Sequence, residues 1–199
     1  MMNKLVVATT NENKVAEIKR MLEGMPYEVC SLKDLGIDID TEETGTTFEE
    51  NAVIKARAVY AITKSFVMAD DSGLEVDYLG KAPGIYSSRY MGVDTPYDIK
   101  NQHIIDELKG VAKKDRTARF VCAMALITPD GKEYVRTGTM EGFVAEAIKG
   151  ENGFGYDPIL WLDEYGKTSA ELTMDEKNKI SHRGTALGLV KEILELRGE

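Results

Sequence analysis

The amino-acid sequence predicts an α/β protein with a mixed β-sheet. Over the first part of its 199 residues, short apolar runs alternate with segments whose apolar residues recur at helical spacing. Further along, strand-like segments follow one another directly, which favours antiparallel pairing in the same sheet. Because the chain has no internal repeat, low-complexity segment or linker, residues 1–199 are predicted to form a single domain.

Two strands and two helices are expected in the first third of the chain. Residues 5–8 and 27–31 have the composition of strands, and the helix between them, residues 13–23, has an apolar side made of Val15, Ile18, Met21 and Leu22. Thr47 and Glu50 have the spacing of a capping box. They predict a second helix, whose apolar stripe is Phe48, Ala52, Val53, Ala56, Val59 and Tyr60.

The remaining elements follow from the same signals. Strands are expected at 66–69, 74–78 and 141–147, and strands 119–128 and 133–139 flank a hairpin turn at Pro129-Asp130-Gly131. Pro96 favours a helix start, and that helix runs to about Leu108 with Ile99, Ile104, Ile105 and Leu108 facing inward. Another capping box, Thr173 to Glu176, precedes a last helix at 183–197 that Ser181 can cap.

Composition excludes some classes of partner. The 25 basic and 34 acidic residues leave a net charge of −9, whereas a general nucleic-acid or anionic-membrane binder needs a basic surface. A small anionic substrate stays compatible, because salt screens charge beyond ~8–10 Å. No signal peptide or membrane-spanning stretch is recognisable, and Cys30 and Cys122 lack metal-ligand spacing. We therefore expect reduced, packed thiols in a cytoplasmic protein.

The most informative motif is Asp70-Asp71-Ser72-Gly73, which follows the apolar run of residues 66–69. We interpret it as a buried strand that ends in two acids. Successive side chains of a strand point to opposite faces, so Asp70 and Asp71 should face different surroundings. Only one of them can then enter a given cleft, and the other should accept hydrogen bonds. The alternative is a polar turn that closes a hairpin.

Two further polar turns carry candidate ligands for phosphate or metal. The turn before the first helix contains Thr9, Thr10, Asn11, Glu12, Asn13 and Lys14. Helix-start N–H groups and a lysine suit phosphate oxygens, although plain N-capping by Thr10 or Asn11 would also account for this turn. Glu43 could supply a second carboxylate for Mg²⁺, or belong to a solvated acidic turn. Lys55 could reach phosphate, or extend to solvent.

The last third of the chain contains two candidate base-binding segments. In Gly153-Phe154-Gly155-Tyr156-Asp157-Pro158, two glycines flank an aromatic residue that can stack on a flat ring, although an ordinary strand start with core aromatics is the alternative. Lys177 and Ser181-His182-Arg183 form a basic group near a predicted helix start, where cations oppose the helix dipole. His103 is expected on an exposed helix face, without a role.

Taken together and in order, these segments resemble the inosine/xanthosine triphosphate pyrophosphatase family, the non-canonical purine NTP hydrolases. Matching stretches cover almost the whole chain and are specific in their joint order. They are residues 8–14, 43–52, 69–74, 82–90, 153–158, 170–177 and 181–184. Residues 148–152 depart from the family pattern, which has a Pro-Arg-Gly-like sequence before the Gly153 turn.

The resemblance implies an elongated mixed β-sheet flanked by helices, with two lobes around a central substrate cleft, and a homodimer. It implies Mg²⁺-dependent release of pyrophosphate from ITP, dITP or XTP, with Asp71 as proton acceptor and metal ligand and Glu43 as second metal contact. Substrate contacts would come from Thr9 to Lys14, Lys55, Ser72, Phe154 to Asp157, Lys177, His182 and Arg183. Two alternatives are a pyrophosphatase for other modified nucleotides and a non-catalytic nucleotide sensor.

Overall fold

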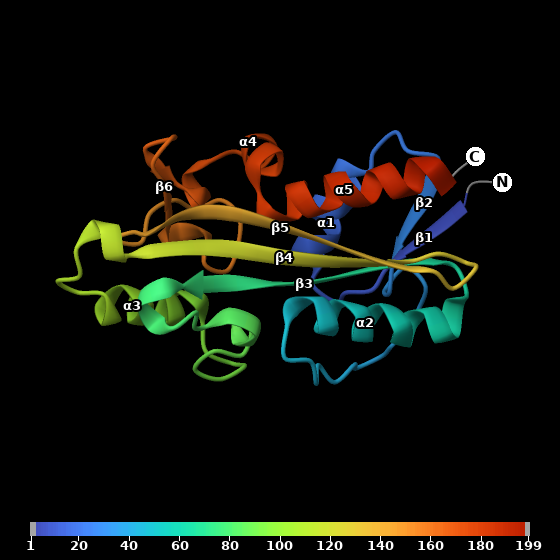
Figure 1. Ribbon diagram of the computed structural model, residues 1–199, viewed down its shortest axis with the longest axis horizontal. Coiled ribbons are helices and arrows are strands. Elements are labelled where there is room, and N and C mark those ends of the chain that lie inside the picture. Colours follow the sequence, from blue (N-terminus) through green and yellow to red (C-terminus); the bar gives the residue numbers. More distant parts are fainter. Residues whose placement is uncertain (1–2, 198–199) are drawn as a thin grey trace. The chain divides into compact units, whose positions relative to one another are not determined.

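The computed structural model describes residues 3–197 and contains a seven-stranded mixed sheet with five α-helices. The strand order is β2-β1-β3-β4-β5-β6-β7 (Figure 1). The strands are β1 Asn3–Val7, β2 Tyr27–Ser31, β3 Phe66–Val76, β4 Thr117–Ile127, β5 Glu133–Val144, β6 Leu160–Leu162 and β7 Lys167–Thr168. The helices are α1 Glu12–Met21, α2 Phe48–Thr63, α3 Tyr97–Glu107, α4 Met174–Ile180 and α5 His182–Arg197. The predicted α/β class with a mixed sheet is confirmed.

The chain forms two compact units. The first unit contains the residues up to Asp71, Cys122–Gly138 and the segment from Arg183 onward, and the second contains Ser72–Val121 and Thr139–His182. The boundaries fall inside β3, β4 and β5, so three strands run through both units. The prediction of one domain over residues 1–199, with a central cleft, stays a prediction.

In the first unit, β1 pairs in parallel with both β2 and β3. Helix α2 lies on one side of this part of the sheet, and α1 and α5 lie on the other (Figure 1). The core between the sheet and α1 and α5 is apolar, because Val15, Ile18 and Leu22 pack there with Phe66 and Met68. Alternation along β3 places Asp70 on the same face as Phe66 and Met68.

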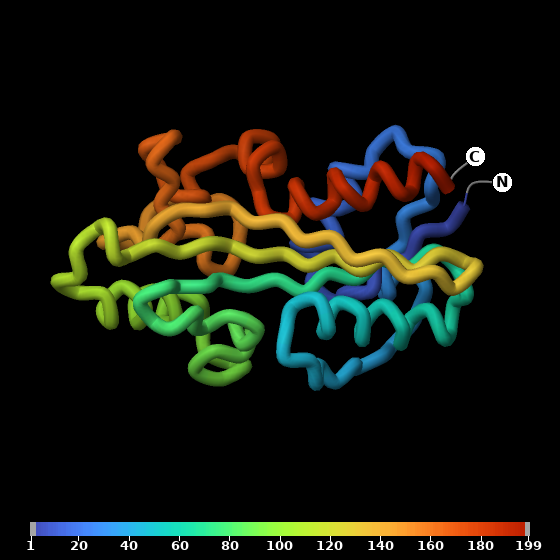
Figure 2. Tube along the Cα trace, in the orientation of Figure 1, coloured from blue at the N-terminus to red at the C-terminus, as the bar shows by residue number. Residues whose placement is uncertain are grey.

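In the second unit, the core joins α3 to β3, β4, β5 and β6, and includes Leu74, Ile104, Phe120, Ile159 and Leu162. Strands β5, β6 and β7 pair antiparallel. The chain trace of β4 and β5 forms a hairpin (Figure 2), and its predicted turn is confirmed by a Thr128 N–H bond to the Lys132 carbonyl of 3.0 Å.

Several strand predictions were wrong at their ends. The runs 66–69 and 74–78 belong to one strand, β3, which continues through both aspartates instead of ending at them or turning back. Likewise, 133–139 and 141–147 are mostly one strand, β5. The acids can stay inside a strand because each carboxylate has cationic partners, so neither is buried without a counter-charge.

The helix predictions were closer. Both capping residues behave as expected: Thr47 accepts the Glu50 N–H, and Thr173 forms a full capping box with Glu176. Glu50, however, accepts from the N–H and hydroxyl of Thr46 instead of closing a box on Thr47. None of the helices within the described residues has the length and apolar character needed to cross a bilayer.

Candidate active site

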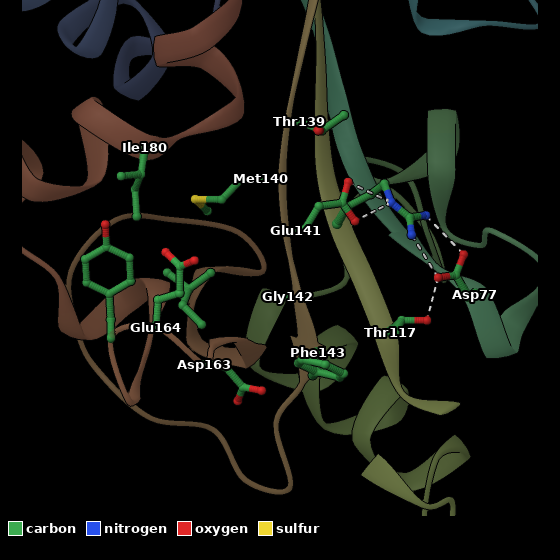
Figure 3. Close-up of a pocket in the computed structure, with 13 residues that line it drawn as sticks. Asp77, Thr117, Thr139, Met140, Glu141, Gly142, Phe143, Asp163, Glu164 and Ile180 are labelled. Atoms are coloured by element: carbon green, nitrogen blue, oxygen red, sulfur yellow. Dashed lines mark hydrogen bonds and ion pairs between the residues drawn. The ribbon is translucent and has the colours of Figure 1, made fainter. Parts of the chain in front are cut away.

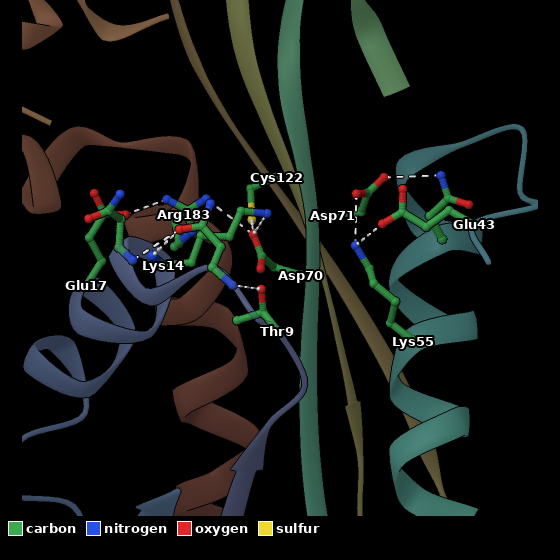
Figure 4. A network of polar contacts seen from close by, with 12 residues as sticks. Thr9, Lys14, Glu17, Glu43, Lys55, Asp70, Asp71, Cys122 and Arg183 are labelled. Atoms are coloured by element: carbon green, nitrogen blue, oxygen red, sulfur yellow. Dashed lines mark hydrogen bonds and ion pairs between the residues drawn. The ribbon is translucent and has the colours of Figure 1, made fainter. Parts of the chain in front are cut away.

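The two adjacent acids of β3 lie on opposite faces of the strand, as predicted (Figure 4). On the α1 and α5 side, Asp70 is 1% exposed; its Oδ2 lies 2.9 Å from Lys14 Nζ and accepts from Arg183 at 3.2 Å. Arg183 also bonds Glu17. Burial opposes ionisation of Asp70, but Lys14 and Arg183 outweigh it and hold the pKa of Asp70 well below its usual range.

On the α2 side, Asp71 belongs to a different cluster. Its Oδ1 accepts from Lys55 at 3.0 Å and its Oδ2 accepts from Asn51 at 3.2 Å, while Lys55 also donates to Glu43 at 2.8 Å. Burial raises the pKa of Asp71, although Lys55 opposes the shift. Burial also acts to lower the pKa of Lys55, but the carboxylates around it outweigh burial and raise that pKa.

This second cluster fits a divalent cation. Two carboxylates converge on one ammonium, so Glu43, Lys55 and Asp71 together carry one negative charge in excess. Mg²⁺ is commonly held by one or two carboxylates together with substrate phosphates. Among residues 3–197, no group of three or more acidic, histidine or cysteine side chains is placed to bind a metal alone. The chemistry of this pair therefore matches a cation that arrives with a phosphate ligand.

The turn before α1 is ordered by its own side chains. Asn11 caps the helix by accepting from the N–H groups of Asn13 at 3.0 Å and Lys14 at 3.3 Å, and Thr9 accepts from Asn11 N–H at 3.2 Å. The N-capping interpretation of this turn is confirmed, with Asn11 as the cap. Glu12 is exposed and bonds Lys33. The turn ends at Lys14, whose ammonium group forms an ion pair with Asp70.

In the second unit, the Gly153 turn is built around a buried acid. Asp157 is 2% exposed and accepts from Lys177 at 2.7 Å, from Ser169 at 2.8 Å and from the N–H of Phe154 at 2.8 Å. Gly153 has φ +75°, and a Cβ there would lie 2.1 Å from the Asp157 carboxylate. The glycine is therefore required by the close approach of the carboxylate.

The second unit also contains aromatic rings in contact with a lysine or a histidine. Lys177 Nζ lies 5.1 Å from the centre of the Phe154 ring, and the His182 ring stacks on Phe120 at 4.9 Å. Tyr156 is buried, and its hydroxyl donates to the Ser87 carbonyl at 2.8 Å. The second unit thus brings together Phe154 and Lys177, while Arg183, which follows His182 in sequence, directs its guanidinium to Glu17 and Asp70 in the first unit.

Ser72 and Gly73 continue β3 in the second unit. A Cβ on Gly73 would lie 2.4 Å from the Gly84 carbonyl and 2.4 Å from the Ser87 hydroxyl. Gly73 therefore permits the close approach of the Gly84 carbonyl and the Ser87 side chain inside a strand. Ser72 is partly exposed beside it.

Sequence reasoning missed Asn51 and Glu17. Both are buried polar residues on otherwise apolar helix faces, and each bonds a charged group of a cluster. A polar residue at a helical core position was the signal that could have found them. His103, expected to be exposed, is half-buried with its ring 6.0 Å from Tyr90.

A pocket of about 490 Å³ in the second unit is a poor candidate for an anionic substrate. Its lining includes Arg119, but that guanidinium is bound to Asp77 at 2.9 Å and Glu141 at 2.8 Å (Figure 3). Asp163 and Glu164 also line it. The negative charge of this lining would repel phosphate.

The fold and the acid clusters define a class of protein. Carboxylates that can hold a cation, together with lysines that can stabilise phosphate charge, suit an enzyme that acts on phosphorylated small molecules.

The chain belongs to the Ham1 family, whose sequence profile matches residues 5–193. It is 49% identical to the dITP/XTP pyrophosphatase of Bacillus licheniformis, over 98% of this chain and 99% of the relative, and 48% identical to that of Bacillus subtilis, over 98% of each. Among solved structures, the Staphylococcus aureus Ham1 protein superposes with a TM-score of 0.87 at 40% identity, covering 98% of this chain and 99% of that one. The nucleoside-triphosphatase, dITP/XTP pyrophosphatase, of Mycobacterium abscessus gives 0.74 at 42% identity, covering 94% and 98%.

Proposed function

We propose that this protein hydrolyses the non-canonical purine triphosphates ITP, dITP and XTP to the monophosphate and pyrophosphate in a Mg²⁺-dependent reaction. The observation that carries the proposal is the Asp71 cluster, in which a carboxylate with a raised pKa is held by Lys55 and Asn51 beside Glu43. Relatives that match nearly the whole chain bear the name dITP/XTP pyrophosphatase.

Asp71 is the proposed general base. A carboxylate whose pKa is raised is a stronger base than an ordinary one and accepts a proton from water more effectively, provided that it is ionised at the working pH. Lys55 keeps Asp71 ionised through the 3.0 Å contact, and Asn51 fixes the second oxygen. Asp71 therefore removes the proton of the water that attacks the α-phosphorus.

Glu43 and Asp71 are the residues that would hold Mg²⁺. When bound, the cation supplies charge neutralisation of phosphate oxygens and lowers the pKa of coordinated water. The excess negative charge of the Glu43, Lys55 and Asp71 group supports this assignment. Ser72, next in the chain, is proposed to contact the substrate.

The turn from Thr9 to Lys14 is proposed to bind the departing pyrophosphate. Lys14 supplies a cation and the α1 N-terminus a partial positive charge, both of which stabilise negative charge on the leaving group. The N–H groups of Asn13 and Lys14 already bond Asn11, so they contact phosphate only if the Asn11 side chain gives way.

Phe154 to Asp157, Lys177, His182 and Arg183 are proposed to recognise the base. Hypoxanthine and xanthine carry a carbonyl at position 6, where adenine carries an amino group. Hydrogen-bond donors from Lys177 or His182 pair with that carbonyl, but they would face the amino group of adenine, which is also a donor. Such unpaired buried groups can support ~10⁴–10⁵-fold discrimination against the adenine nucleotide. We also propose that the protein is cytoplasmic and forms a homodimer; sedimentation analysis tests the homodimer.

The decisive experiment is product analysis over a panel of ITP, dITP, XTP, the canonical NTPs and modified pyrimidine triphosphates, with Mg²⁺ and with excess chelator. The expected result is pyrophosphate plus monophosphate from the deaminated purines, and loss of turnover with chelator. Orthophosphate plus diphosphate as products would overturn the proposal. Preference for a modified pyrimidine would favour the alternative pyrophosphatase, and no turnover would favour a nucleotide sensor.

A further inference from the structure

The Gly153 turn is held by residues of helix α3 that no part of the proposed chemistry uses. Asn101 Nδ2 donates to the Gly155 carbonyl at 3.0 Å, and the neighbouring Lys100 Nζ donates to the Ser88 carbonyl at 2.8 Å. The turn itself bonds the same loop, through Tyr156 and Ser87. All of these contacts lie within the second unit.

These α3 residues are buried although they are polar. Asn101 is 2% exposed and Lys100 is 1% exposed, while Ile99, which the sequence pattern placed inside, is 50% exposed. The Oδ1 atom of Asn101 is buried without a hydrogen-bond partner among residues 3–197. Burying an asparagine and a lysine while the adjacent isoleucine stays exposed is unfavourable for folding alone. The positions of Asn101 and Lys100 are therefore better explained by the carbonyl groups to which they donate.

The bond from Asn101 completes the restraint on Phe154. The N–H of Phe154 is bonded to Asp157, and the next carbonyl along the chain, that of Gly155, is bonded to Asn101. Gly153 and Gly155 have φ +75° and +67°, and glycine adopts positive φ about as readily as negative φ. The Asp157 carboxylate and the Asn101 amide therefore restrain the backbone on either side of Phe154, in a conformation that the two glycines permit.

We propose that Asn101 is a positioning residue for purine recognition: its amide fixes the Gly155 peptide and with it the backbone that carries the Phe154 ring. The inference rests on the proposed function, in which Phe154 stacks on the base. Asn101 touches neither the base nor the phosphates in this scheme. Its loss should weaken binding of the base while leaving the phosphate chemistry of the first unit intact.

The test compares Asn101→Leu with Gln102→Leu in steady-state hydrolysis of dITP. Leucine has the branching and the number of side-chain heavy atoms of asparagine but no donor. Gln102 is an exposed neighbour whose side chain bonds only Asp106 among the described residues. Loss of one buried hydrogen bond predicts about a tenfold rise in KM for Asn101→Leu, with kcat within about threefold of wild type. Gln102→Leu should leave both unchanged.

Inhibition by inorganic pyrophosphate separates positioning from general damage. Pyrophosphate has no base, so its inhibition constant should be the same for wild type and Asn101→Leu. A parallel rise in that constant, or an unchanged KM for dITP, would overturn the inference. If wild type itself does not turn over dITP, the proposed function fails and this inference fails with it. If wild type is active and Asn101→Leu has the same KM for dITP, only the inference is refuted.

Asn101→Asp provides a second variant in case leucine prevents folding. A neutral carboxyl group can donate to the Gly155 carbonyl and an ionised one cannot. The KM of Asn101→Asp relative to wild type should therefore fall toward unity as pH is lowered. A ratio independent of pH would contradict the assigned hydrogen bond.

Discussion

The polar cluster of the first unit and the Gly153 turn of the second unit bury charge in different ways. Around β3, acids and cations are interleaved on both faces, and the Asp71 side keeps an excess negative charge. Around the turn, one buried acid is paired with one lysine and also accepts from neutral donors, and that lysine faces an aromatic ring. An unbalanced charge suits chemistry with cations and phosphate, whereas a balanced pair with rings suits recognition of a flat base.

The largest expected effect is from Asp71→Asn. Asparagine keeps the shape of the side chain and its proximity to Asn51 and Lys55 but cannot accept the proton, so kcat for dITP should fall about 10²–10⁴-fold. Pyrophosphate release measures this. Thermal unfolding provides the control, because the variant should melt near the wild-type temperature; retained turnover would remove Asp71 from its proposed role.

The pH profile of turnover sharpens the same assignment. Because burial raises the pKa of Asp71, the acid limb of kcat/KM should fall at a pH above the usual range of an aspartate, as the base becomes protonated. Lys55→Met removes the cation that opposes this shift and should move the limb further upward. An acid limb of kcat/KM at the same pH in wild type and Lys55→Met would show that Lys55 does not act on the pKa of Asp71.

Asp70→Asn should instead damage stability. It removes the buried counter-charge of Lys14 and one of the two carboxylates on Arg183, and breaking a buried pair typically costs about 3–5 kcal/mol. The pKa of Asp70 is lowered by folding, so its stabilising contribution is present above the unfolded pKa of about 3.9 and is lost as pH falls toward the folded value. Denaturant titrations at pH 7 and pH 3 should show a smaller difference from wild type at the lower pH.

Asp157→Asn tests the second unit. The change removes the charge partner of Lys177 but preserves the shape that accepts the Phe154 N–H. Weakened positioning of the turn predicts an approximately tenfold rise in KM for dITP with little change in kcat. A fall in kcat as large as that of Asp71→Asn would erase the distinction between the two regions.

The smallest effects are expected at helix caps. Asn11→Ala and Thr47→Ala should each lower stability by about 1 kcal/mol, because each cap satisfies backbone N–H groups at a helix start. Only Asn11 lies in the proposed phosphate-binding turn, so only Asn11→Ala should also change KM for dITP. Equal kinetics in the two variants would remove that turn from the site.

Local signals in the sequence were sufficient for several elements. Strand β2, the capping box at Thr173 and the opposite orientation of Asp70 and Asp71 follow from alternation and capping, which depend on near neighbours. The continuation of β3 through its two aspartates was not predictable in this way. It depends on Lys14, Arg183 and Lys55, which are distant in sequence and neutralise those carboxylates.

By itself, the sequence determined the α/β class, the apolar faces of α1 and α2 and the order of the polar motifs, because periodicity and turn chemistry are local properties. Only the tertiary structure decided which charges meet: that Lys55 is shared by Glu43 and Asp71, that Arg183 turns to Asp70 and Glu17, and that Asn101 holds the Gly155 carbonyl. The reason is that burial makes each charge depend on the partner that folding brings to it, and sequence spacing does not specify that partner.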